Sequence, residues 1–200
     1  MATSIRVIVA LGNPGAEHAD DRHNAGFWLA DALAQTWRLA FRSERRYKCE
    51  LLRHEHAGAT LWLQKPLTYM NNSGAAVQPL CAFYKIEPQA VLVVHDDLDL
   101  PAGVARLKQG GGHGGHNGLR DIHRVLGPDY CRLRIGIGHP GHRAGVLGHV
   151  LSSPAPQERE HISTAIDAGI AAIDTMITQG WDRAVQQLHS RRRASATGSD

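Results

Sequence analysis

The stretch IRVIVALGNPG, residues 5–15, sets a short apolar run directly before an Asn-Pro-Gly turn. An apolar run of this length, rich in Ile and Val and closed by a turn, predicts a buried β-strand over residues 5–11. The run is too short for the apolar core of a signal peptide or for a membrane span. No later segment approaches the ~18 apolar residues that a transmembrane helix needs. We therefore expect a fold without a membrane-embedded part.

Short strand patterns alternate with helix patterns along the rest of the chain. Strands are predicted over residues 48–55, 59–66, 90–97 and 131–138, and helices over residues 25–37, 77–84, 119–126, 156–179 and 181–188. Pro79 is expected near the first turn of its helix, where a missing N–H is tolerated. Almost wholly apolar strands are typical of sheets covered on both faces. The predicted fold is a single α/β domain with a central, mostly parallel or mixed sheet and helices on both faces. It spans residues 1–190, and a basic and polar flexible tail follows over residues 191–200.

Composition narrows the class of protein further. The chain has 200 residues, the size of one domain, and a formal net charge of +3. This mildly basic balance is compatible with a polyanionic partner. Its three cysteines are odd in number and widely spaced, which predicts neither a disulfide framework nor a CxxC metal site. A reducing cytoplasm is the expected location.

Polar segments follow several predicted strands. In open α/β sheets, ligands bind beyond the carboxyl ends of strands. Asn13 follows the first strand, Asp96 ends the strand over residues 90–97, and the glycine loop QGGGHGGHNGLRD, residues 109–121, precedes a helix. Glycine lets the backbone approach a ligand and adopt positive φ, and a helix start offers free amides to phosphate. The loop fits neither GxxxxGK[ST] nor a strand–GxGxxG–helix pattern, so nucleotide binding by those routes is not predicted.

Individual residues allow both a chemical and a structural interpretation. His23, in DDRHNAG, could move protons near neutral pH, or it could be a helix-capping or surface histidine. Asp96 could hold a neighbouring imidazole in one tautomer, or it could only end a strand by binding loop amides. In LTYMNNSG, Asn71 could bind amide or carbonyl groups, whereas Asn72 or Ser73 is expected to cap the next helix.

Other chemistries find less support. The chain has no GxSxG or HExxH motif, so a common serine hydrolase or zincin is not predicted. His54 and His56 share a strand face and could bind a metal, but no third ligand is evident. Basic side chains on neighbouring strands near the glycine loop could contact phosphate or simply form solvated strand faces. These are Arg106, Lys108, Arg132 and Arg134.

Taken together, the motifs resemble those of the bacterial peptidyl-tRNA hydrolase family. The resemblance rests on LGNPG (11–15), RHNAG (22–26), TYMNNSG (68–74), HDDLDLP (95–101), GGGHGGHNGLRD (110–121) and RLRIGIGHPG (132–141). They occur in the order and at the spacing of the family, and the likeness runs from Ile5 to Leu188. The glycine-histidine block and HDDLDLP are highly specific in combination.

The resemblance implies hydrolysis of the ester that joins a peptide, or an N-blocked aminoacyl group, to the 3′ end of tRNA. This reaction recycles tRNA from prematurely released peptidyl-tRNA. A carboxylic ester hydrolase of this family is expected to be a cytoplasmic monomer that contacts the tRNA acceptor stem and 3′ end. It is expected to need no metal or organic cofactor and to bind no membrane.

Matching motifs carry the residue roles over. By this resemblance, His23 is the general base that activates water, and Asp96 is the carboxylate that orients His23. Asn13 is the residue that distinguishes blocked from unblocked aminoacyl-tRNA. Further residues are expected to contact substrate or tRNA, with Lys108 and Arg134 as a pair that holds the 5′ phosphate. These residues are His18, Tyr69, Met70, Asn71, His116, Asn117, Lys108 and Arg134.

One position departs from the family, and two alternatives remain. His18 stands where the family usually has tyrosine, which puts substrate affinity in question. It also makes His18 a second candidate base, ranked below His23 because RHNAG matches intact.

The first alternative function is that of an RNA-binding module without catalysis, which would not need His23 with Asp96. The second is a metal-dependent hydrolase that uses His54 with His56, or His139 with His142.

Overall fold

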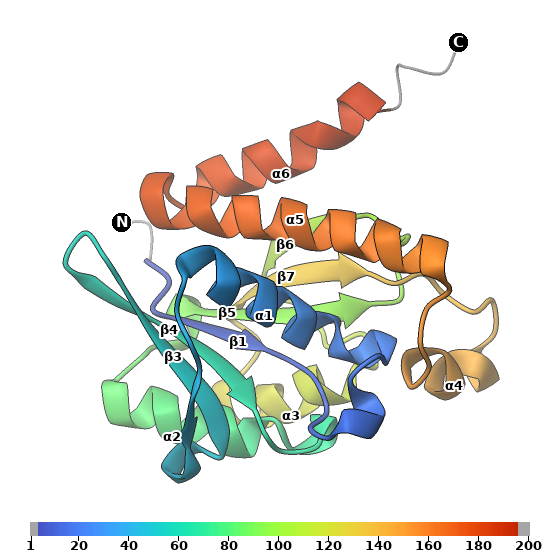
Figure 1. Ribbon diagram of the computed structural model, residues 1–200. Helices are drawn as coiled ribbons and strands as arrows, with labels where there is room; N and C mark the ends of the chain where they lie inside the picture. The colour runs from blue at the N-terminus through green and yellow to red at the C-terminus, as the bar shows by residue number, and fades with distance from the viewer. Residues whose placement is uncertain (1–3, 196–200) are drawn as a thin grey trace.

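A computed structural model describes residues 4–195 of the chain, with the side chains of residues 4–190. These residues form one domain around a seven-stranded sheet of order β2-β3-β4-β1-β5-β7-β6, with helices on both faces (Figure 1). The strands are β1 (Val7–Ala10), β2 (Arg42–Glu44), β3 (Cys49–His56), β4 (Ala59–Pro66), β5 (Val91–Asp97), β6 (Ala105–Gln109) and β7 (Cys131–Gly136). The helices are α1 (Ala25–Trp37), α2 (Gly74–Tyr84), α3 (Asn117–Leu126), α4 (Val146–Val150), α5 (Pro156–Gln179) and α6 (Trp181–Ser195).

The sheet is mixed, as the sequence predicted. Strands β4, β1, β5 and β7 run parallel in the centre, so their carboxyl ends meet at one edge. The β2–β3, β3–β4 and β6–β7 pairs are antiparallel and form the two flanks. The loops that carry Asn13 and Asp96 therefore lie side by side at the carboxyl edge, because β1 pairs directly with β5.

The central strands bury both of their faces in two separate cores. Along β1, Ile8 and Ala10 pack against one core with α1, α5 and α6, whereas Val7 and Val9 pack against the other with α2 and α3. All four are fully buried. Because side chains alternate in a strand, this arrangement explains why the central strands are apolar throughout rather than at every second position.

Helix α1 lies unusually close to the sheet at its first turn. A Cβ on Gly26 would lie 2.4 Å from the carbonyl oxygen of Leu11 and 2.8 Å from that of Val94. Only glycine permits this approach. The glycine of RHNAG thus brings the turn before α1, with His23, against the carboxyl ends of β1 and β5.

Three details differ from the sequence prediction. Pro79 lies inside α2 rather than in its first turn, so its ring denies a hydrogen bond to the helix backbone. The last helix was expected to end at Leu188, but α6 continues to Ser195. It therefore extends into the segment 191–200 expected as a flexible tail, of which residues 196–200 lie outside the described residues. The short elements β2 and α4 were not predicted, and β6 was only implied by the basic residues Arg106 and Lys108, because each carries too few residues to show a periodic pattern.

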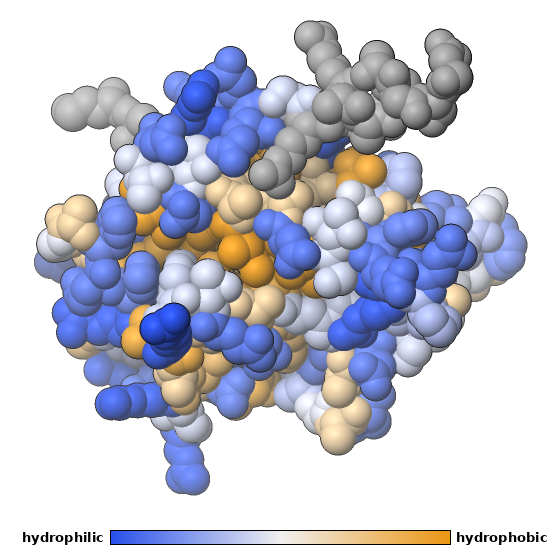
Figure 2. Space-filling model, turned by 45° about the horizontal axis from the view of Figure 1, so that its top comes forward, coloured by the Kyte–Doolittle hydropathy of each residue, from blue (hydrophilic) through white to orange (hydrophobic). Residues whose placement is uncertain are grey.

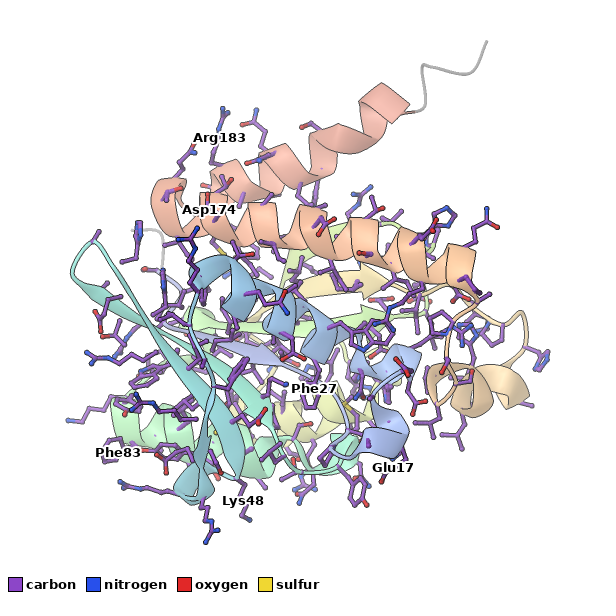
Figure 3. All side chains as sticks on the ribbon, in the orientation of Figure 1. Glu17, Phe27, Lys48, Phe83, Asp174 and Arg183 are labelled. Atoms are coloured by element: carbon purple, nitrogen blue, oxygen red, sulfur yellow. The ribbon has the colours of Figure 1, made fainter. Side chains whose placement is uncertain are left out.

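The surface is mixed in polarity. In the space-filling view, apolar side chains gather in a band across the middle of the visible face, with hydrophilic ones around it (Figure 2). Phe83, half exposed, projects at the far end of α2, whereas Phe27 lies between α1 and the sheet (Figure 3). Within residues 4–195, no helix combines the length and apolar character that a membrane crossing requires.

Candidate active site

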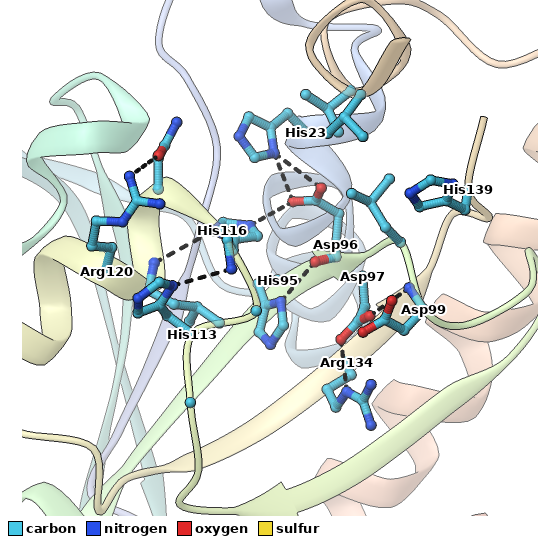
Figure 4. A pocket seen from close by; sticks show the side chains of 18 of the residues that line it. His23, His95, Asp96, Asp97, Asp99, His113, His116, Arg120, Arg134 and His139 are labelled. Atoms are coloured by element: carbon cyan, nitrogen blue, oxygen red, sulfur yellow. Dashed lines mark hydrogen bonds and ion pairs between the residues drawn. The ribbon is translucent and has the colours of Figure 1, made fainter. Parts of the chain in front are cut away.

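His23 and Asp96 meet at the carboxyl edge of the sheet. Asp96 follows Leu92 and Val94 at every second position of β5, and these two residues face α1. The same alternation points the Asp96 side chain toward α1 and the 3₁₀ turn Arg22–Asn24 that precedes it. There, Nδ1 of His23 lies 2.9 Å from Oδ1 and 3.0 Å from Oδ2 of Asp96 (Figure 4). Both side chains are buried.

This contact fixes the chemical state of the imidazole. A carboxylate only accepts hydrogen bonds, so Nδ1 of His23 carries a hydrogen and Nε2 keeps its lone pair in the neutral ring. Burial alone lowers the pKa of His23, but the charge and hydrogen bond of Asp96 outweigh burial and raise it above the ordinary value. Burial likewise favours a higher pKa for Asp96, but His23 and His116 lower it well below the usual range. Asp96 therefore stays ionised and His23 is a strengthened base.

His116 binds the same carboxylate from the other face of the sheet. Its Nε2 lies 2.9 Å from Oδ1 of Asp96, and its Nδ1 accepts the amides of Gly118 and Leu119 at 3.2 and 3.4 Å. His116 is thus the N-cap of α3. Because Nδ1 accepts amide hydrogens, Nε2 must carry the ring hydrogen and donate it to Asp96. Both nitrogens are engaged, so His116 orients Asp96 and has no nitrogen left for a substrate.

The three groups could be taken for a metal site. The ligand atoms of His23, Asp96 and His116 lie within 4.8 Å of one another, and two histidines with one carboxylate can bind iron or zinc. A metal needs the lone pair of a ring nitrogen. In His116, Nε2 would have to lose its hydrogen while Nδ1 still accepts two amides. The hydrogen-bond pattern therefore describes a carboxylate held by two imidazoles rather than a cation site.

His95 is a third imidazole that the sequence analysis did not single out. It lies under His116, with ring centroids 5.1 Å apart, and its Nδ1 lies 2.7 Å from the backbone oxygen of Asp96. Burial, and then the charge of His116, lowers the pKa of His95 to about 3. This ring is neutral at physiological pH and packs against the backbone of Asp96. Its place in HDDLDLP was the only signal available in the sequence.

Asn13 is held by two neighbours. The side chain of Asn24 accepts the backbone N–H of Asn13 at 2.8 Å and donates to its carbonyl at 3.0 Å. Oδ1 of Asn13 in turn accepts the backbone N–H of Met70 at 2.7 Å. The amide of Asn13 must therefore present its NH₂ group away from Met70. Asn24, a residue that sequence reasoning missed, lies in RHNAG next to His23.

The remaining predicted contact residues surround this centre to different degrees. Met70 is buried below the first turn of α3, whereas Tyr69 is 63% exposed and Asn71 is exposed. Asn117, also exposed, opens α3, and its Oδ1 accepts from Arg120 at 2.9 Å. His18 instead binds Asp21 through Nδ1 at 2.8 Å.

A cleft of about 700 Å³ opens over the His23–Asp96 pair. Its wall includes His116 and Asn117 from α3 and the glycine loop, Lys108 and Arg134 from β6 and β7, and Val146 and Leu147 from α4 (Figure 4). The predicted residues His18, Asn13, Tyr69, Met70 and Asn71 do not line this cleft. The structure thus brings six of the predicted residues to one cleft and leaves these five outside its wall.

The basic residues near the cleft have different surroundings. Arg134 donates from Nε to Asp97 at 2.7 Å, and Lys108 is exposed. Arg132 is 3% exposed and donates to the carbonyls of Gly111 and Gly112. Its burial contradicts the interpretation of Arg132 as part of a solvated strand face, and its guanidinium holds the glycine loop at the cleft wall.

The glycine loop reaches the site by a route that the sequence did not reveal. We expected it to leave the carboxyl edge, but β6 is antiparallel to β7, and Gln109 pairs with Cys131 at the opposite edge. The loop then runs back along the sheet to His116. Four of its glycines have φ between 58° and 97°, a region that other residues rarely enter. These are Gly110, Gly111, Gly114 and Gly115.

Comparison with known proteins agrees with this geometry. Residues 7–196 match the family model described as peptidyl-tRNA hydrolase. The chain belongs to this family. It is 52% identical over 189 residues to the peptidyl-tRNA hydrolase of Alkalilimnicola ehrlichii, covering 94% of this chain and 96% of the relative. It is 47% identical over 192 residues to that of Neisseria gonorrhoeae, covering 96% of this chain and all of the relative.

A solved structure extends the similarity to the fold. The crystal structure of peptidyl-tRNA hydrolase from Acinetobacter baumannii superposes with a TM-score of 0.90 at 44% identity, over 94% of this chain and 96% of the other. The family resemblance, the α/β fold and the enzyme class predicted from the sequence are confirmed. The chain is a hydrolase of the peptidyl-tRNA hydrolase family.

Proposed function

We propose that this chain cleaves the ester between a peptide, or an N-blocked aminoacyl group, and the 3′ end of tRNA by general-base catalysis. His23 activates the attacking water, and Asp96 orients His23 and stabilises its protonated form. The observation that carries the proposal is the contact of Nδ1 of His23 with both oxygens of Asp96. It leaves Nε2 as the basic atom of a ring that lines the cleft.

The proton and the electron pairs balance along this route. Nε2 of His23 takes a proton from water as the water oxygen bonds to the ester carbonyl carbon. The tetrahedral intermediate then expels the 3′ oxygen of the terminal ribose, which receives the proton from His23. The products are a free carboxylic acid and tRNA with a free 3′ hydroxyl. General-base help typically supplies about 10²–10⁴-fold, and positioning of the water and ester supplies more.

The same tautomer argument favours His23 over the two other candidates for the base. His116 has both nitrogens occupied, by Asp96 on one side and by the amides of α3 on the other. His18 has a carboxylate of its own in Asp21, but it does not line the cleft. Only His23 combines an ionised partner, a free nitrogen and a place in the cleft wall.

We assign the donor for the carbonyl side of the substrate to Asn13, which lies outside the wall of the cleft but is bound to Asn24, the residue after His23. Oδ1 of Asn13 is already used by Met70, so its NH₂ group is the part that remains for a ligand. An NH₂ donor can stabilise a developing oxyanion, and it disfavours the charged ammonium of an unblocked aminoacyl group. This accounts for a preference for blocked esters through the orientation of one amide.

Recognition of tRNA falls to the exposed residues around the cleft. Lys108 and Arg134 are proposed to hold the 5′ phosphate. Arg106 and Lys108 pair with Arg134 and Arg132 across β6 and β7, so their side chains share one face of the sheet. Tyr69, with 63% of its surface exposed, offers a ring for stacking. Asn71 and Asn117 offer amides, and His18 a ring, beside the acceptor end. His116 acts through Asp96.

The proposal includes a cytoplasmic monomer in which residues 1–190 form the catalytic domain, with no cofactor, metal or membrane partner. The test is release of a blocked aminoacyl group from N-acetyl-aminoacyl-tRNA, with unblocked aminoacyl-tRNA as the control substrate. We expect rapid release from the blocked ester only. Binding of tRNA without any release would instead favour the RNA-binding module.

A further inference from the structure

Arg22, the residue before His23, is buried and lies at the centre of a partly buried hydrogen-bond network. Its guanidinium donates from Nε and Nη2 to the two carboxylate oxygens of Glu158, at 2.6 and 2.7 Å. Its Nη1 lies 3.1 Å from the carbonyl oxygen of His149, 2.9 Å from that of Ser152 and 2.8 Å from Oγ of Ser152. The backbone N–H of Arg22 also donates to the carbonyl of Ser152 at 3.1 Å.

These contacts join three parts of the molecule that are far apart in the sequence. Arg22 belongs to the 3₁₀ turn that carries His23, His149 and Ser152 lie at the end of α4, and Glu158 lies in the first turn of α5. Figure 1 shows α4 and the starts of α1 and α5 together at the right of the view, at the end of the molecule to which β5 and β7 point. The His149 ring extends the network to the carbonyls of Ile137 and Gly138 after β7, at 3.2 and 3.1 Å.

We infer that Arg22 is a positioning residue for catalysis, which locks the turn of His23 to the α4 wall of the cleft. The inference rests on the proposed role of His23 as the base. Val146, Leu147 and Val150 of α4 line the same cleft as His23. One side chain thus sets the position of the base and of the wall that faces the substrate.

The chemistry of the contact requires arginine. Its planar fork satisfies Glu158 with two parallel bonds and still directs Nη1 at three acceptors. Lysine has one ammonium with three hydrogens and cannot reach Glu158 in the bidentate manner while it serves the end of α4. The arginine is only 8% exposed, and a buried charge of this kind is retained only with full pairing. The Arg22 hydrogen bonds in turn lower the pKa of Glu158.

The test compares Arg22→Lys with wild type by two measurements. The first is the pKa of the His23 imidazole, followed by NMR. The second is kcat and KM for N-acetyl-aminoacyl-tRNA as a function of pH. If the turn loosens, the His23–Asp96 contact weakens, so the pKa of His23 falls and the acid limb of kcat/KM moves to lower pH. Misplacement of a reacting group by about 1 Å costs about 10²-fold, so we expect kcat to fall by about 10- to 100-fold.

Two further variants make the result specific. Glu158→Gln keeps the size of the partner side chain and removes its charge, so the His23 pKa and kcat should change in the same direction by a smaller amount. This variant tests the inference even if Arg22→Lys fails to fold. Arg159→Lys is the matched control, because Arg159 is the next residue along α5 and stacks outside the cleft on Trp28, 3.4 Å from the ring centroid.

The inference is overturned if folded Arg22→Lys and Glu158→Gln both keep the His23 pKa and the kcat of Arg159→Lys, whatever their thermal stability. A loss of stability alone would mark Arg22 as structural. The NMR measurement does not depend on which residue is the base. Normal turnover by His23→Ala would disprove the proposed role of His23 as the base. A changed pKa of His23 in Arg22→Lys would still show that Arg22 positions the turn that carries His23.

Discussion

Nδ1 of His23 lies 2.9 Å from Oδ1 of Asp96, although 73 residues separate them in the chain. The contact depends on two features of the backbone. The alternation of β5 turns Asp96 toward α1, and Gly26 lets the start of α1 lie against the strand ends. Because the contact occupies Nδ1, the imidazole has a defined direction, with Nε2 as its only basic atom.

The first prediction concerns the base itself. Replacing His23 with alanine removes the cleft imidazole that combines an ionised carboxylate partner with a free nitrogen, so turnover should fall by at least about 10²-fold, the lower end for general-base catalysis. His23 as a residue is only 7% exposed and contributes little surface to binding, so affinity for tRNA should stay close to that of the wild type. Release of N-acetyl-aminoacyl groups and a tRNA binding assay measure the two effects.

His18→Ala is the control for this experiment, because His18 also pairs with a carboxylate, at 2.8 Å from Asp21. It should keep most of kcat and change mainly KM. If His23→Ala retained more than a tenth of wild-type turnover while His18→Ala lost it, the base would be His18.

The second prediction is the pH dependence of catalysis. His23 must be neutral to act as a base, so kcat/KM should fall as the pH drops below its pKa, which lies above the ordinary value because of Asp96. Asp96→Asn removes the charge that raises this pKa but leaves the burial that lowers it. The acid limb should therefore move to lower pH, while the plateau falls because the tautomer is no longer fixed. An unmoved acid limb in Asp96→Asn would disprove the electrostatic link.

Most of the fold could be predicted because it depends on local patterns. The hairpin around residues 57–58 and the helix over residues 156–179 appear at the predicted positions. In both, the apolar period and the turn or stop residues agree with the final packing. The end of α6 was missed, because residues 189–195 carry no apolar signal that would extend the helix.

The site was only partly predictable, since its bonds join residues distant in sequence. His23 and Asp96 could be proposed as partners by family resemblance, but the shared use of Asp96 by His116 depends on the route of the glycine loop. That route follows from the antiparallel pairing of β6, which no residue pattern reveals. Arg132 shows the same limit, because no sequence pattern distinguishes a buried loop anchor from an arginine on a solvated strand face.

The third prediction tests the phosphate contacts. Lys108 is exposed and lines the cleft, and no hydrogen bond ties its ammonium to the residues described here. Lys108→Ala should weaken tRNA binding and reduce the slope of log K against log salt by about one, as expected for one lost phosphate contact. Arg53→Ala, on β3 at the other end of the sheet order, is the control and should leave the slope unchanged. Equal slopes for Lys108→Ala and wild type would exclude the clamp.

The fourth prediction concerns metals. Because both ring nitrogens of His116 are already engaged, the His23–Asp96–His116 group should not need a cation to work. Dialysis against EDTA should leave the rate at which N-acetyl-aminoacyl groups are released close to that of the untreated enzyme. A large loss that zinc restores would support the metal-dependent alternative, and variants of His54 and His139 would then locate the ion.

The last prediction concerns the discrimination between blocked and unblocked esters. Asn13→Asp keeps an oxygen for the N–H of Met70, so the turn should fold, but it replaces the NH₂ donor with a negative charge. That charge repels a developing oxyanion and attracts an ammonium group. Release from N-acetyl-aminoacyl-tRNA should fall by about 10²–10³-fold, the usual loss for one oxyanion donor. Release from unblocked aminoacyl-tRNA should fall less, so the ratio of the two rates narrows. Asn72→Asp makes the same chemical change at an exposed neighbouring position and should preserve the ratio. If Asn13→Asp lowered both rates equally, Asn13 would stabilise the reaction without selecting the substrate.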